Sequence, residues 1–95
     1  MDEIERNESI RSEGDNANLQ ELEEERRKLR RLQIMMSMVM QVLSEQSDLT
    51  IEEASELVAS SRKAALALFP GKELAYDLIY KPRLQRVMNE RFRLQ

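Results

Sequence analysis

Residues 34–43 are the most hydrophobic part of the chain and read IMMSMVMQVL. Only Ser37 and Gln41 are polar, so a helix of this sequence is apolar around nearly its whole circumference. Such a helix has to be buried on all sides. The rest of the chain offers only short helices, which cover two faces at most, and a second copy of the same helix would cover the remainder. We therefore expect a core that is partly intermolecular.

This segment belongs to a long helix predicted over residues 17–46, with Asn16 or Asn18 as its N-cap. Leucine or methionine recurs every seven residues from Leu22 to Leu43, and Leu32 and Val39 occupy complementary heptad positions. About three repeats are at the threshold for a coiled coil. We predict a homodimer, or a higher oligomer, whose self-association uses one set of side chains: Leu29, Leu32, Met36, Val39, Met40 and Leu43.

Turn signals divide the rest of the chain into three shorter helices. Thr50 and Glu53 form a capping box at the start of a helix over residues 51–68. Pro70 and Gly71 end that helix, and a third helix follows over residues 72–80. Pro82 then opens a fourth helix over residues 82–93. Residues 17–95 are therefore predicted to form a single all-α domain. Its long N-terminal helix is partly coiled-coil-like and intertwines with a second copy.

Each shorter helix has a predicted apolar stripe. The third helix is expected to bury Leu74, Ala75, Leu78 and Ile79, with the hydroxyls of Tyr76 and Tyr80 pointing outward. In the fourth helix, Arg91 falls within the apolar stripe, and we expect its charged end to reach out to water. The other members of that stripe are Leu84, Val87, Met88 and Phe92.

Residues 1–16 are predicted to be a disordered acidic tail, because they contain too few large apolar side chains to offset the cost of ordering. The charged residues after Met1 do not fit a secretory signal. No apolar run approaches the roughly 20 residues of a membrane-spanning helix. The absence of cysteine favours a reducing compartment. We therefore expect a soluble, cytoplasmic protein.

The chain contains no cysteine and no histidine, and its two glycines lie far apart. This removes the side chains of most nucleophilic, acid–base and zinc chemistry, together with glycine-rich phosphate loops. Glu73 and Asp77 stand four residues apart on the third helix, but carboxylates at this spacing are common on helix surfaces. We predict no catalytic, cofactor-binding or metal-ligating residue, and no enzymatic activity.

Charge is segregated along the chain. Residues 1–25 carry a net charge of −8, residues 26–33 carry +5, residues 34–61 carry −5 and residues 62–95 carry +5. The simpler interpretation is that these blocks are solvated helix faces, with pairs such as Glu23 with Arg27 and Glu24 with Lys28. The alternative is contact of a basic block with an external polyanion, for which the candidates are Arg83, Arg86 and Arg93.

Two functions are compatible with these features. The first is a non-enzymatic helical module for protein–protein interaction, a scaffold, adaptor or regulator that self-associates through the long helix and needs no cofactor. The alternative is a small nucleic-acid-associated regulatory protein that uses the basic C-terminal helix. The alternative requires the arginines of that helix to share one face with Arg62 and Lys63.

Overall fold

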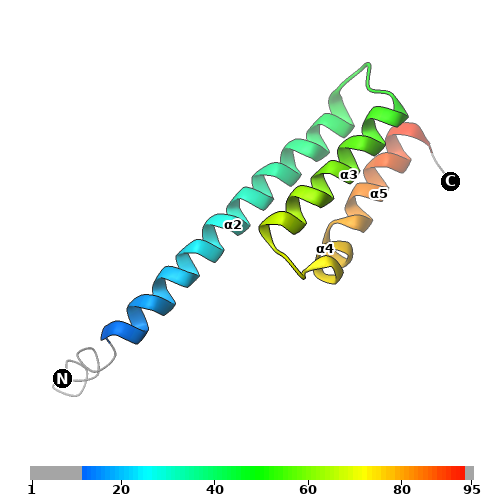
Figure 1. Ribbon diagram of the computed structural model, residues 1–95. Coiled ribbons are helices and arrows are strands. Elements are labelled where there is room, and N and C mark those ends of the chain that lie inside the picture. Colours follow the sequence, from blue (N-terminus) through cyan, green and yellow to red (C-terminus); the bar gives the residue numbers. More distant parts are fainter. Residues whose placement is uncertain (1–11, 94–95) are drawn as a thin grey trace.

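The structure, a computed structural model, describes residues 12–93, and this part of the chain contains four α-helices and no strand (Figure 1). The helices are α2 (Ser12–Glu45), α3 (Ile51–Leu68), α4 (Glu73–Ile79) and α5 (Lys81–Phe92). The prediction of an all-α fold is confirmed. The three shorter helices agree with their predicted ranges to within one residue at each end.

The long helix begins earlier than the sequence indicated. α2 starts at Ser12 rather than at residue 17, so Asn16 and Asn18 lie within the helix and neither is its N-cap. Residues 12–16 of the predicted tail are therefore helical. Residues 1–11 of that tail lie outside the described part of the chain.

α3 and α5 pack against the C-terminal half of α2, and α4 joins them at one end of this bundle (Figure 1). The N-terminal half of α2 extends past the bundle, and we call residues 12–31 the arm. The molecule is elongated, with extents of 64 × 23 × 19 Å. Its radius of gyration is 19.8 Å, whereas a compact domain of this length has a value of about 12 Å.

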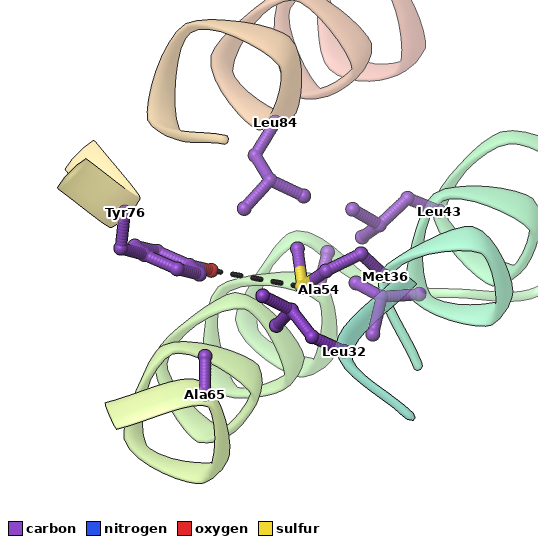
Figure 2. Packing of buried hydrophobic residues seen from close by; sticks show 8 residues of the cluster. Leu32, Met36, Leu43, Ala54, Ala65, Tyr76 and Leu84 are labelled. Atoms are coloured by element: carbon purple, nitrogen blue, oxygen red, sulfur yellow. Dashed lines mark hydrogen bonds between the residues drawn. The ribbon is translucent and has the colours of Figure 1, made fainter. Parts of the chain in front are cut away.

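The core of the bundle receives side chains from all four helices (Figure 2). Met36 and Leu43 of α2 are the largest fully buried side chains. Burial of each such side chain stabilises the fold by about 1.5–3 kcal/mol. Small residues on α3 allow its axis to come close to α2. The buried apolar residues are Leu32, Met36, Val39, Leu43, Ala54, Ala65, Tyr76 and Leu84.

Local signals set the boundaries of α3. The Glu53 amide donates to Thr50 Oγ1 at 3.1 Å, and the Thr50 amide donates to Glu53 Oε1 at 3.0 Å, which confirms the predicted capping box. After α3, Gly71 adopts a φ of 79°, a conformation that side-chain-bearing residues rarely adopt. The chain thus turns where the Pro70-Gly71 pair indicated.

The orientation predicted for α4 is wrong. Leu74 and Leu78 are 73% and 69% exposed, whereas Tyr76 is buried and its hydroxyl donates to Met36 Sδ at 3.9 Å (Figure 2). The Tyr76 ring offers a large apolar area to the core. The neighbouring Asp77 binds Arg62 of α3, and this pair fixes which side of α4 faces inward.

Arg91 does not reach out to water as the sequence suggested. Its guanidinium donates to the carbonyl oxygens of Leu43 at 3.3 Å and of Ser44 at 3.1 Å, and also to that of Gln46. Carbonyls at the C-terminal end of a helix lack intrahelical partners and lie at its negative pole. α2 has no basic residue in its own last turn. Arg91 of α5 supplies the missing charge and joins the two helices.

We expect Arg91→Met, which keeps much of the apolar stem, to lower the free energy of unfolding by about 1–2 kcal/mol because the carbonyls at the end of α2 lose their charged donor. The measurement is urea unfolding followed by far-ultraviolet circular dichroism. Arg86→Met, at an exposed position on the same helix, is the matched control and should change stability by less than about 0.5 kcal/mol. Equal effects of the two substitutions would contradict the capping role.

Candidate interaction surface

Exposed large apolar side chains gather in three places on the described part of the chain. The arm carries Leu19, Leu22 and Leu29, and the outer side of α2 carries Ile34 and Met38. α4 carries the third group, which is Leu74, Leu78 and Ile79. Single exposed apolar residues are ordinary, whereas grouped ones are typical of contact surfaces.

The six side chains predicted to mediate self-association lie in different environments. Within the bundle, Leu32, Met36, Val39 and Leu43 are buried against the chain's own α3, α4 and α5, and of these four only Leu32 also lines the end groove described below. Met40 is half-buried against the same core, and Leu29 is 46% exposed. Contact of these six side chains with a second copy stays a prediction. Leu29 is the most accessible of the six.

The hydrophobic segment at residues 34–43 is covered on one side only. The bundle buries three of its apolar side chains and leaves Ile34 and Met38 54% and 60% exposed. Beside them lies an outer groove of about 400 Å³ between α2 and α3. Its lining is apolar apart from one arginine and consists of Arg31, Ile34, Met35, Met38, Val39, Val42 and Leu57.

A second groove, which we call the end groove, lies where the arm leaves the bundle. It has a volume of about 330 Å³ and takes its walls from α2, from the end of α3 and from α4. Leu29 and Leu32 line it on the α2 side, so it continues the row of exposed leucines on the arm. The opposite walls include Phe69, Ile79 and Tyr80, and its charged members are Glu25 and Lys72.

The arm carries its charges in two consecutive blocks. Four glutamates lie between residues 21 and 25, and five bases lie between residues 26 and 31. Arg27 approaches Glu23 to 3.9 Å, as predicted, whereas Lys28 approaches Glu25 at 3.9 Å rather than Glu24. Three of the four side chains are largely exposed and that of Lys28 is half-buried, and at these long distances the pairs contribute little to stability.

A polar contact between α3 and α4 was not foreseen from the sequence. Arg62 donates through Nε and Nη2 to the two carboxylate oxygens of Asp77, at 3.0 and 3.1 Å. These hydrogen bonds hold the pKa of Asp77 below its usual value. Burial raises the pKa of the Tyr76 hydroxyl, although the hydroxyl of Ser61 partly offsets this shift. Each group is explained by packing between helices, with no reaction required.

The three arginines proposed for polyanion contact lie on α5. Arg83, Arg86 and Arg93 are exposed, and the Arg83 guanidinium stands 5.9 Å from the centre of the Tyr80 ring. Arg62 lines a different cavity, next to Lys81 and other side chains of α5. At 100° per residue, those side chains project from the side of α5 opposite to Arg83 and Arg86. The structure therefore does not bring Arg62 onto their face.

No family model, curated protein or solved structure matches this chain. Within residues 12–93, no helix is both long enough and apolar enough to cross a membrane. The function must therefore be inferred from the surface of the chain itself.

The ion pair of Asp77 gives a testable dependence on pH. Because the pKa of Asp77 is lower in the folded state than in the unfolded state, its carboxylate stabilises the fold above about pH 4, and this contribution disappears as the pH falls further. We expect wild type to be more stable than Asp77→Asn near neutral pH and the difference to shrink towards about pH 3. Urea unfolding at several pH values measures this difference in the free energy of unfolding.

The control for this experiment is the same substitution in an Arg62→Met background. Asp77→Asn should have little effect there at any pH, because the partner of the carboxylate has been removed. A difference between wild type and Asp77→Asn that is independent of pH would contradict the role of the ion pair.

Proposed function

We propose that this chain is a non-enzymatic module for protein–protein interaction, a cytoplasmic scaffold, adaptor or regulator that self-associates through its long helix. The observation that carries the proposal is the arm, a helical segment whose leucines are left exposed by the chain's own bundle.

The physics of isolated helices supports a partner for the arm. Most of the stability of a helix in a protein comes from packing of its apolar face, and helices without such contacts are marginal in water. Leu19, Leu22 and Leu29 lie at spacings of three and seven residues and thus on one side of α2. This apolar side extends beyond the reach of α3 and α5, so another molecule is the natural source of its cover.

A second copy of the chain is the simplest partner. Leu22 and Leu29 continue at the seven-residue spacing into Met36, which lies in the core. Two such helices can therefore present identical stripes to each other across a twofold axis. The four helices of residues 12–93 also enclose a modest core, and association is a common way for small domains to gain stability.

The other functions receive less support. The sequence has no histidine or cysteine for ordinary catalysis. Arg62 is bound to Asp77, so one expected member of a basic face for nucleic acid already has its charge paired within the fold.

Sedimentation equilibrium over a range of concentrations tests the proposal. We expect a reversible dimer, and we expect Leu22→Ala/Leu29→Ala to raise its dissociation constant by at least about a hundredfold, since four leucine contacts are lost per dimer. The matched control is Ile34→Ala/Met38→Ala, which removes exposed apolar groups from the other side of α2 and should leave the dissociation constant nearly unchanged.

Two outcomes would count against this arrangement. A monomer at every concentration would contradict self-association. Weakening by the Ile34→Ala/Met38→Ala control alone would place the contact at the outer groove and would remove the arm from the interface.

A further inference from the structure

We propose that two copies pair their arms in opposite directions. The part of each arm that carries Leu19 and Leu22, which we call the tip, then lies at the end groove of the other copy. This inference rests on the proposed self-association through α2 and adds the direction, the register and the occupant of the groove. Three features of the arm and the bundle support it independently: the order of the charges, the spacing of the leucines and the lining of the groove.

The order of the charges favours the antiparallel direction. Within the arm, glutamates at residues 21, 23, 24 and 25 precede bases at residues 26, 27, 28, 30 and 31. Two arms in parallel would place glutamate beside glutamate and base beside base, and like charges at close range oppose association. Two antiparallel arms place the acidic block of each copy beside the basic block of the other.

The contacts within one arm do not prevent this pairing. The pairs Glu23–Arg27 and Glu25–Lys28 each have an N–O distance of 3.9 Å, which is long for an ion pair, and all of their side chains except that of Lys28 are largely exposed. Such contacts are weak in water. Their charges can therefore interact with a second helix without the loss of a strong existing contact.

One register satisfies the charges and the leucines together. If the crossing point lies between Glu25 and Arg26, then Leu22 of one copy is level with Leu29 of the other, because both stand equally far from that point. In the same register Glu21 of one arm lies within one turn of Lys28 of the other, and at 100° per residue both side chains flank the leucine stripe on the same side. The midpoint between Leu22 and Leu29 and the boundary between the two charge blocks thus coincide.

The same register brings the arm tip to the end groove. Leu19 of one copy is then level with Leu32 of the other, and Leu32 lines the end groove. The tip carries Leu19 and Leu22 for the apolar walls formed by Phe69 and Ile79. The bundle end therefore offers apolar cover to the arm tip.

Disulfide trapping tests the direction, and the natural chain contributes no cysteine to confuse the result. A mixture of the Leu22→Cys and Leu29→Cys variants should form a mixed disulfide dimer under mild oxidation, because these positions are level in the antiparallel pair. Leu22→Cys alone should form much less disulfide, because its two copies are offset by about 10 Å along the axis, beyond the reach of a disulfide. Ser60→Cys, exposed on α3, measures random collisions.

Salt dependence provides a second measurement that does not rely on cysteine. The dissociation constant of the wild-type dimer should rise severalfold as sodium chloride is increased, since screening weakens attraction between opposite charges. Arg26→Glu/Arg30→Glu should raise the constant by roughly tenfold or more at low salt. Arg83→Glu/Arg86→Glu, which makes the same change of charge on α5, should have a much smaller effect.

The outcomes separate this inference from the proposed function. Efficient disulfide formation by Leu22→Cys alone, with a dimer that tightens at high salt, would show parallel arms and overturn the inference while self-association stands. A dimer in which neither cysteine pairing exceeds the Ser60→Cys background would also overturn it. A monomer under all conditions would overturn the proposed function itself.

Discussion

The dominant constraint on this structure is that three short helices must cover one long one. α3 and α5 lie along the C-terminal half of α2 and bury Met36 and Leu43 completely, but their coverage ends near Leu32. The apolar side of α2 continues further, through Leu29 to Leu22 and Leu19. The elongated shape, the projecting arm and the exposed leucines of residues 12–93 all follow from this mismatch in length.

Two charged contacts hold the bundle at its opposite ends. At one end, Arg91 of α5 donates to the last carbonyls of α2, where unpaired acceptors and the negative pole of the helix attract a cation. At the other end, Arg62 of α3 binds Asp77 of α4, which sets the rotation of α4 and directs Tyr76 into the core. Tyr76 and Ile79 of α4 line the end groove, so the rotation of α4 also shapes a wall of the proposed docking surface.

Local signals were sufficient to predict the bounds of the three shorter helices but not the face that α4 turns to the core. The capping box at Thr50 and the turn at Gly71 act within a few residues, so the bounds of α3 follow from the sequence. α4 has seven residues, and its orientation depends on Arg62, which lies fifteen positions away from Asp77. Arg91 binds carbonyls more than forty positions away. The heptad pattern located the apolar side of α2, but it carries no information on whether the same chain or another covers that side.

The composition of α2 changes where its partner changes. From Leu32 onwards α2 packs against segments of its own chain. Because these segments are covalently connected to α2, its buried face needs no charged residues to select a partner. In the arm, Leu22 and Leu29 each have charged neighbours, and the bases follow the acids in a fixed order. Leucine burial provides affinity without direction, whereas ordered charges penalise wrong partners and wrong orientations. A helix face that binds a separate molecule needs leucines for affinity and ordered charges for selectivity. The arm carries both, whereas the buried face of α2 carries only apolar residues, and this difference supports contact of the arm with another molecule.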